Sequence, residues 1–453
     1  MGAVPRPPLH LVGAAPRRPA LLTLGPLVAV MFFTVSGGPF GVEGLVGGVG
    51  PGLAVLLLVA TPLLYSVPET LLIGELASML PAEGGYYVWV KRAFGPFWGF
   101  TNGWLSWMYS LIDMAIYPVL LLQYLRFFTG DIGRLPGWLL ALALIWGATW
   151  LNLRGTRVVG IASGGFLVLV LAPFAALAGA GLSWWGRGAG HALLALPFHA
   201  GGTTFLGALG LGISQCIWNY SGWDNPSTVG EEIADPGSTY PNALKRALPL
   251  VTVAYLAAVV PALAVTDWHR WSDGAWPAIG AEVGGPWLAA WIAGAGMVSA
   301  FALFNALLLS YSRVPLVLAR DRFLPAGLSA TDDRGTPRRA VLVSAVGYSA
   351  FALLSFGGLL AADVLLYTAA LALEFAALIA LRRREPGLRG SFRVPLGVPG
   401  LIALAALPVL LIGVAVGLEV RSRTIGLVGV MAAVVLGVAG PAAYAALRRR
   451  ARA

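Results

Sequence analysis

Residues 36–41, Ser36-Gly37-Gly38-Pro39-Phe40-Gly41, lie in the middle of the first long apolar stretch, residues 21–49. Three glycines and a proline in this short run oppose a regular helix, because glycine costs about 1 kcal/mol and proline about 3 kcal/mol relative to alanine. An interruption at membrane depth must line a cavity, since lipid offers its backbone groups no hydrogen-bond partners. We therefore expect a broken helix with a binding site at the break. A plain proline kink is the alternative.

The composition is that of an integral membrane protein. Of the 453 residues, 58% are hydrophobic and 11% are charged, whereas a soluble domain has about 25% charged residues. Many apolar runs reach about 20 residues, which is enough to cross the hydrocarbon core. We predict an all-α fold with twelve transmembrane helices, at residues 21–48, 51–79, 97–128, 136–153, 158–182, 205–232, 243–266, 286–318, 339–357, 361–381, 397–418 and 424–447.

The basic residues predict the orientation of these spans. With both termini in the cytoplasm, 23 of the 30 Lys and Arg residues fall on the inner side, 6 fall on the outer side, and Arg313 lies within a span. This asymmetry agrees with the positive-inside rule. We therefore expect a multi-pass protein of the cell membrane with cytoplasmic tails at residues 1–20 and 448–453. The net charge of +10 then reflects topology and does not indicate nucleic-acid binding.

The sixth span contains a second interruption, Asn219-Tyr220-Ser221-Gly222-Trp223-Asp224-Asn225-Pro226. We expect a helix to about Trp218, a turn, and a restarted helix with Asn225 as its cap and Pro226 at its first position; a kink is again the alternative. Spans 1 and 6 hold matching places in two halves of opposite topology. This predicts inverted repeats at residues 21–186 and 203–384, with spans 11 and 12 at residues 396–447, as in secondary transporters.

The ends of the half-helices suit an amine or an amino acid. The helix that starts after Gly41 presents free N–H groups to a carboxylate, and carbonyls before each break suit an ammonium group. Acidic residues inside spans are functional candidates, because a carboxylate at the bilayer centre costs about 2.5–3.5 kcal/mol. They are Glu43, Glu69, Glu75, Asp113, Asp224 and Glu374.

Three of these acids are the main candidates for cation binding, and each has a structural alternative. Glu43 could instead pair with backbone N–H groups at the new helix start. Asp224 could cap the restarted helix, and Asp113 could be a packing residue that shares a face with Tyr109 and Tyr117.

Aromatic residues also cluster at the breaks. Phe40, Trp218, Tyr220 and Trp223 lie there, and aromatic faces attract ammonium groups. We expect Phe40 and Trp223 to close over the ligand, although anchoring at the lipid interface is the alternative role for tryptophan. No nucleophile and base stand at a mutual spacing that indicates catalysis. The sequence therefore predicts no enzyme, no cofactor and no metal site.

The chain resembles the amino acid–polyamine–organocation transporter superfamily over nearly its whole length. Residues 74–81, 84–86 and 93–96 resemble the superfamily's motif after helix 2, and residues 230–243 resemble its motif after helix 6. Within the superfamily, residues 35–43, 112–120 and 218–225 are most similar to the polyamine uptake transporters of the L-type amino acid transporter branch.

This resemblance implies a leucine-transporter-type fold with broken helices 1 and 6, alternating access, and proton-driven, sodium-independent uptake of polyamines or amino acids. It implies a substrate site formed by Ser36, Gly37, Gly38, Phe40, Gly41, Glu43, Asp113, Tyr220, Ser221, Gly222, Trp223, Asp224 and Asn225. The expected partners are a small amine or amino acid, protons and membrane lipid.

The chain also departs from the polyamine branch. Gly44 and Gln123 stand where that branch tends to have acidic residues. This favours an exchanger of neutral or aromatic amino acids as the alternative function, and a nutrient sensor without transport is an alternative of another class. The relatives that bind a heavy-chain partner use a cysteine after helix 3. Cys216 is the single cysteine and residues 126–136 contain none, so we expect no disulfide-linked partner.

Overall fold

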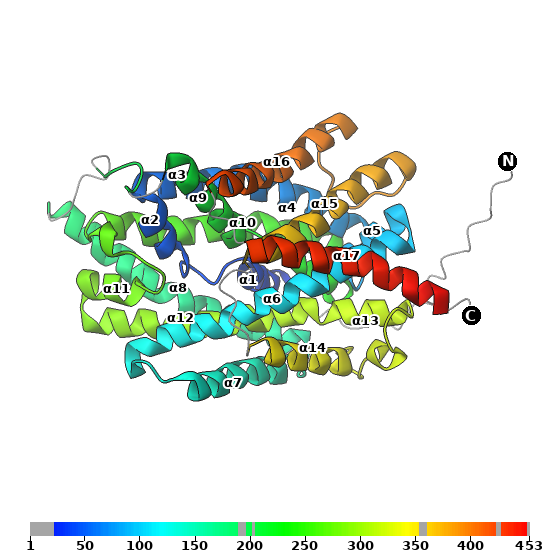
Figure 1. Cartoon of the computed structure of the whole chain (residues 1–453), viewed down its shortest axis with the longest axis horizontal. Helices are drawn as coiled ribbons and strands as arrows, with labels where there is room; N and C mark the ends of the chain where they lie inside the picture. Colours follow the sequence, from blue (N-terminus) through cyan, green and yellow to red (C-terminus); the bar gives the residue numbers. More distant parts are fainter. Residues whose placement is uncertain (1–21, 189–195, 202–203, 353–359, 423–426, 451–453) are drawn as a thin grey trace.

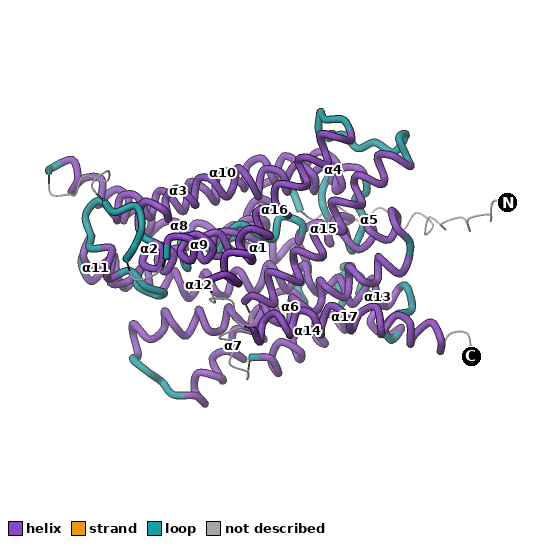
Figure 2. The backbone as a smooth tube through the Cα atoms, turned by 45° about the horizontal axis from the view of Figure 1, so that its top comes forward, coloured by secondary structure: helices purple, strands orange, loops and turns teal. Residues whose placement is uncertain are grey.

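The computed structural model describes residues 22–188, 196–201, 204–352, 360–422 and 427–450. Most helices lie side by side along the long axis of the molecule (Figure 1). Figure 2 shows helices and loops without strands in this part of the chain, where the β-type pairing consists of isolated bridges from Leu22 to Ile233 and from Glu83 to Val229. The prediction of an all-α fold is confirmed.

Nine helical segments within the described ranges are long and apolar enough to cross a membrane. They lie in α3–η1–α4 (Pro51–Thr61, Pro62–Ser66, Val67–Met79), α6 (Pro96–Thr129), α7 (Arg134–Asn152), α8 (Thr156–Gly186), α10 (Pro236–Leu263), α12–α13 (Pro286–Tyr311, Arg313–Arg320), α15 (Leu360–Arg384), α16 (Val398–Ser422) and α17 (Leu427–Arg450). The other predicted spans correspond to shorter helices, namely α1 (Leu24–Val35) with α2 (Val42–Val49), α9 (Phe205–Asn219) and α14 (Arg338–Phe351). The count of twelve spans stays a prediction.

The surface of the outer helices is apolar. Leu63, Val168, Leu410 and Val435 each expose more than 60% of their area. So many large exposed apolar side chains are unfavourable in water and mark a surface that meets another apolar phase. Together with the long apolar helices, they identify a multi-pass membrane protein.

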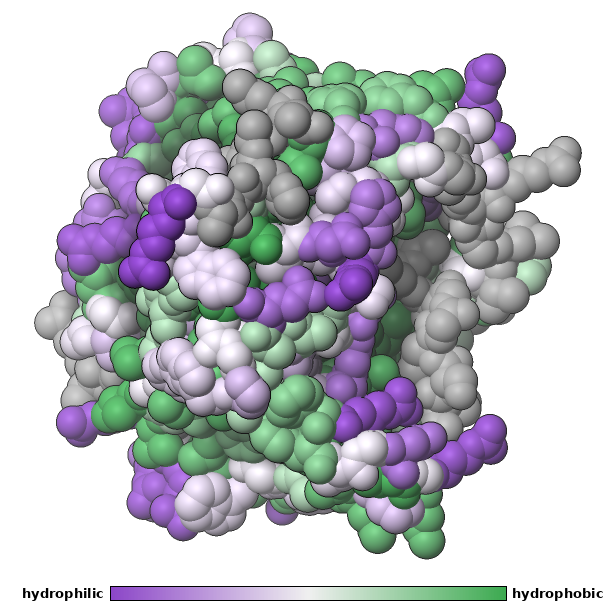
Figure 3. Space-filling model, turned by 90° about the vertical axis from the view of Figure 1, so that its left-hand side faces the viewer, coloured by the Kyte–Doolittle hydropathy of each residue, from purple (hydrophilic) through white to green (hydrophobic). Residues whose placement is uncertain are grey.

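Two connecting helices distinguish the ends of the molecule. α5 (Gly85–Phe94) lies at one end and α11 (Trp276–Gly284) at the other (Figure 1), and we call these the α5 end and the α11 end. Figure 3 looks onto the α11 end, where polar side chains lie among apolar ones. The loop before α11 contains η5 (Trp268–Arg270), and η6 (Ala326–Ser329) follows α13.

The interruption predicted at residues 36–41 is present between α1 and α2. Gly38 and Gly41 adopt φ values of +85° and +95°, a region that side chains with a Cβ rarely enter. A Cβ on Gly38 would lie 2.8 Å from the Val170 side chain of α8. Glycine is therefore required at this turn both for its backbone conformation and for close packing.

The second interruption is also present, but the α-helix predicted to restart after it is wrong. α9 ends at Asn219, and the chain continues through short 3₁₀ turns, η3 (Asn225–Thr228) and η4 (Gly230–Glu232). The Asp224 side chain makes no cap hydrogen bond. Instead, the Thr228 hydroxyl lies 3.0 Å from the carbonyl oxygens of both Asn225 and Ser310 and can donate its one hydrogen to either, which helps to satisfy the local backbone without an α-helix.

Ion pairs fix the α5 end. Arg313, which is fully buried, donates to Glu232 at 2.9 Å and to the Thr156 hydroxyl at 3.0 Å. Glu75, one of the acidic residues that the sequence placed inside a span, forms an ion pair with Arg382 at 2.5 Å. Because these partners come from α4, α8, α13, η4 and α15, the pairs tie distant segments together.

Removing Arg313 should destabilise the protein strongly, because Glu232 would stay buried without a partner. We expect Arg313→Ala to lower the free energy of unfolding by about 3–5 kcal/mol, measured by thermal denaturation of the protein in detergent. The matched control is Arg338→Ala, whose side chain is 60% exposed and 4.0 Å from Asp332; it should change stability by less than about 1 kcal/mol. An equal loss of thermal stability in the two variants would contradict the role of Arg313 as the partner of the buried Glu232.

Candidate substrate-binding site

A cavity of about 80 Å³ lies between the two breaks and helices α6, α12 and α15. One water occupies about 10–15 Å³ of such a cavity. The cavity therefore has room for several waters or a small organic cation. Of the predicted site residues, its lining contains Ser36, Gly37, Phe40, Gly41, Asp113, Ser221, Gly222 and Asn225. In this conformation Gly38, Glu43, Tyr220, Trp223 and Asp224 lie outside the lining.

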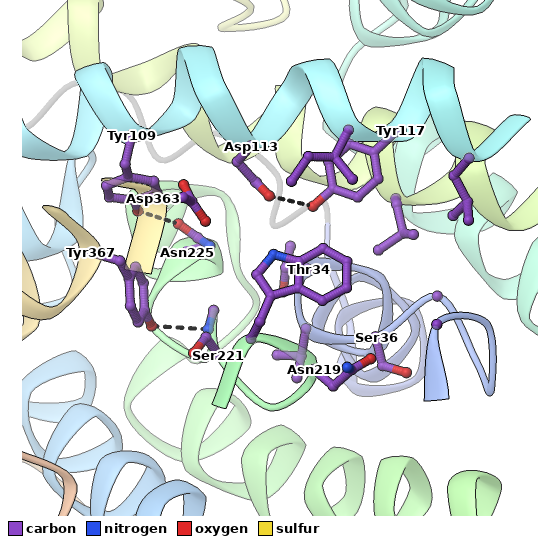
Figure 4. Close-up of a pocket in the computed structure, with 18 of the residues that line it drawn as sticks. Thr34, Ser36, Tyr109, Asp113, Tyr117, Asn219, Ser221, Asn225, Asp363 and Tyr367 are labelled. Atoms are coloured by element: carbon purple, nitrogen blue, oxygen red, sulfur yellow. Dashed lines mark hydrogen bonds between the residues drawn. The ribbon is translucent and has the colours of Figure 1, made fainter. Parts of the chain in front are cut away.

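Asp113 of α6, one of the predicted site residues, lines the cavity. Its carboxylate accepts hydrogen bonds from the Tyr117 hydroxyl at 2.7 Å and from the Tyr311 hydroxyl at 2.9 Å. Tyr117 follows Asp113 by one helical turn, as expected from their spacing, whereas Tyr311 comes from α12. Figure 4 shows Asp113 and Tyr117 projecting from α6 toward the cavity. The two hydroxyls hold the carboxylate in a fixed orientation.

Asp363 of α15 is an acid at the cavity that the sequence analysis missed. It lines the same cavity as Asp113 (Figure 4), and its side chain is buried. Its Oδ1 atom has no hydrogen-bond partner among the described residues. A signal existed in the sequence, because Asp363 precedes Tyr367 by four residues just as Asp113 precedes Tyr117.

The aromatic residues at the breaks divide into two groups. Phe40 lines the cavity and packs edge-on against Tyr124 and Phe174, with ring centroids 4.8 and 5.0 Å away. Trp223 is fully buried outside the lining, and the Tyr220 hydroxyl donates to the Leu58 carbonyl at 2.9 Å. Phe40 is therefore placed to cover a ligand, whereas Trp223 is not in this conformation.

Glu43 is held by protein groups at the α11 end of the cavity. Its carboxylate accepts from the Gly41 N–H at 2.7 Å, the Tyr124 hydroxyl at 2.7 Å and the Gly274 N–H at 2.9 Å. The first contact is the helix-start pairing that the sequence analysis gave as the alternative. Through the other two, Glu43 joins α2 to α6 and to the loop before α11.

Several carbonyls of the breaks are already hydrogen-bonded. In the first break, Ser299 donates to Gly37 at 2.5 Å and Trp276 donates to Pro39 at 2.7 Å. In the second break the donors are hydroxyls, and the pairs are Tyr255 with Asn219, Ser66 with Tyr220, and Tyr240 with Trp223. Of these carbonyls, only that of Asn219 ends a half-helix before a break, and it is not free for an ammonium group. The others lie inside the breaks, so the carboxylates are the better cation ligands there.

Comparison with known proteins now identifies the family. The amino acid permease family model matches residues 26–437. The chain belongs to the amino acid permease family. This permease is 36% identical to the polyamine transporter PUT1 of Oryza sativa subsp. japonica, over 93% of this chain and 78% of the relative. It is 35% identical to the polyamine transporter RMV1 of Arabidopsis thaliana, over 87% and 79%. An uncharacterized transporter of Mycobacterium tuberculosis is 30% identical, over 68% and 70%.

The family and these relatives establish the chain as a membrane transporter rather than an enzyme. The cavity between the breaks of this permease is lined by acidic and aromatic side chains and is the candidate site for a substrate. The site residues carried over from the superfamily stay a prediction.

Gly222 gives a direct test of the geometry at the second break of this permease. Its φ is +106°, and a Cβ there would lie 2.3 Å from the Thr34 carbonyl oxygen of α1. We expect Gly222→Ala to destabilise the protein by at least about 1–3 kcal/mol, the usual size of such backbone strain. A matched glycine, Gly294 of α12, has no atom within 4 Å of an added Cβ, so Gly294→Ala should be neutral or slightly stabilising. Thermal denaturation distinguishes the two variants. An unchanged stability of Gly222→Ala would refute the close approach of Gly222 to the Thr34 carbonyl.

Proposed function

We propose that this permease is a secondary active transporter that imports polyamines or other cationic amines across the cell membrane, coupled to protons and independent of sodium. The observation that carries the proposal is that the carboxyl groups of Asp113 and Asp363 face one buried cavity. Buried carboxylates are unfavourable unless a cation pairs with them. The described lining contains no lysine, arginine or histidine. An ammonium group of the substrate would supply the missing positive charge, and the polyamine transporters among the relatives support this assignment.

The first break bears on whether the substrate also carries a carboxylate. The N–H groups at a helix start form a natural site for a carboxylate. Here the Gly41 N–H already donates to the internal carboxylate of Glu43. Because this N–H group is already hydrogen-bonded, an amine without a carboxylate is favoured over an amino acid as the substrate.

The residue at position 44 bears on the alternative function. A Cβ on Gly44 would lie 1.8 Å from an oxygen of Asp273. The space that an acidic side chain at position 44 would take is thus filled by the Asp273 carboxylate. The region around Gly44 therefore still contains an acidic side chain. For this reason Gly44 is weaker support for an exchanger of neutral or aromatic amino acids.

We further propose twelve spans in two inverted repeats, with the α5 end in the cytoplasm. The positions of the breaks support the repeats, and the basic residues Lys91, Arg92, Arg320 and Arg382 at the α5 end support the orientation. Transport would alternate between opening the Glu43 contacts at the α11 end and opening ion pairs such as Arg320–Glu83, 2.7 Å apart, at the α5 end.

The test is uptake of labelled putrescine into liposomes that contain the purified protein. We expect uptake when the outside is more acidic than the inside, collapse of uptake by a protonophore, and no change when sodium is replaced by choline. Leucine should compete poorly. Uptake that requires sodium would contradict the coupling, and uptake of leucine without putrescine would establish the alternative function.

Asp363→Asn should weaken putrescine transport. Hydrogen bonds to charged groups contribute about 1.5–3 kcal/mol, so the KM for putrescine should rise by about tenfold or more. Asp333→Asn, in the loop between α13 and α14, is the matched control and should leave KM unchanged. If Asp363→Asn also leaves KM unchanged, Asp363 does not contact the amine.

A further inference from the structure

The Tyr367 hydroxyl of α15 lies at a junction behind the cavity. It accepts a hydrogen bond from the Gly222 N–H of the second break at 2.9 Å. The same hydroxyl is 2.8 Å from Oε1 of Glu69 in α4 and 2.8 Å from Oδ1 of Asp224. Figure 4 shows Tyr367 at the edge of the cavity, with one hydrogen bond directed at the second break.

Counting hydrogens at this junction fixes its protonation. A tyrosine hydroxyl carries one hydrogen and accepts through its oxygen lone pairs. The Tyr367 hydroxyl donates its hydrogen to either Glu69 or Asp224, because a single hydrogen cannot be directed at both carboxyls. The remaining carboxyl oxygen, 2.8 Å from the tyrosine oxygen, is a favourable contact only if that carboxyl carries its own proton and donates it. The observed arrangement therefore holds one exchangeable proton on the pair Glu69 and Asp224.

Among the described residues, the surroundings offer no counter-charge that could replace this proton. Glu69 and Asp224 are buried. The titratable groups that interact with the junction come from η1, α5, α6, α10 and α15 and are all phenolic or acidic, namely Tyr65, Tyr86, Tyr109, Tyr240 and Glu374. If both carboxyls lost their protons, two negative charges would share one hydroxyl.

The local structure places Glu69 for this role. A wide π-type turn, η1, immediately precedes α4, and such turns occur frequently at functional sites. From this turn the Tyr65 hydroxyl reaches the Ser221 hydroxyl at 3.0 Å, and Ser66 donates to the Tyr220 carbonyl at 3.3 Å. The turn and Glu69 thus contact the same unwound segment that forms one wall of the cavity.

We propose that Glu69, Tyr367 and Asp224 form the proton-binding site of this transporter, separate from the Asp113–Asp363 site for the amine. The inference rests on the proposed function, since it assigns the coupled proton to particular atoms. A proton from the outer solution forms an O–H bond on one carboxyl of the pair. When that bond breaks toward the cytoplasm, the pair becomes two carboxylates that compete for the Tyr367 hydrogen. Repulsion between them loosens the contact with Gly222, so that the second break responds to the proton.

The experiment compares Glu69→Gln with wild type in proteoliposomes, by two assays of labelled putrescine. Counterflow without any gradient reports binding and reorientation. Accumulation driven by a pH difference of about one unit, with the membrane potential clamped by valinomycin, reports coupling, because one proton can drive about tenfold accumulation under that difference. The amide keeps a hydrogen-bond donor beside Tyr367 but cannot release a proton. We expect the counterflow rate of Glu69→Gln to stay within about threefold of the wild-type rate. The pH-driven accumulation, about tenfold in wild type, should be lost.

Asp333→Asn is the control, because this exposed carboxyl lies in the loop between α13 and α14 and is not part of the junction; it should retain both activities. Tyr367→Phe removes the shared hydroxyl, should also uncouple transport, and decides the question if Glu69→Gln does not fold. Normal pH-driven accumulation by Glu69→Gln would overturn the inference, as would loss of counterflow in a variant that folds. Absence of counterflow in wild type would instead refute the proposed function.

Discussion

The structure depends on finding partners for the backbone groups that the two breaks release at membrane depth. Lipid offers none, so each unpaired group would be costly. Side chains from neighbouring helices provide them, including Ser299 and Trp276 at the first break and Tyr240 and Tyr255 at the second. Because these donors come from α10, α11 and α12, holding the breaks open also fixes how those helices pack. The cavity is the space enclosed by this arrangement.

A second consequence is that the described acids around the cavity and the second break lie among hydroxyl groups instead of bases. Tyrosines donate to Asp113, to Glu43 and at the Glu69–Asp224 junction. A hydroxyl orients a carboxylate but does not neutralise it, so the charge must be balanced by a proton or by a cationic substrate. In our account the cavity acids are balanced by the amine and the junction by the proton. Both sites touch the second break, through Asn225 and Gly222, which would allow the two ligands to influence each other.

The sequence predicted the breaks because clustered glycine and proline oppose a continuous helix, although a proline kink was the alternative at both positions. It also predicted Asp113 at the cavity, since Asp113 and Tyr117 share a helical face. It did not reveal Asp363, which lies near the start of its span and resembles an end residue. The role of Glu69 could not be foreseen either, because it depends on a contact with Tyr367, which is distant in the chain. The restarted helix failed because Thr228 satisfies the backbone in a 3₁₀ turn.

The most direct test of the central claim, an acidic cavity that binds a cationic amine, is the thermal stability of the purified protein with added ligands. A ligand that binds the folded state raises stability by RT ln(1 + [L]/Kd). Putrescine, spermidine, arginine, leucine and phenylalanine would be screened at equal concentrations. We expect stabilisation by putrescine and spermidine and none by leucine or phenylalanine. Stabilisation by leucine or phenylalanine alone would contradict this expectation.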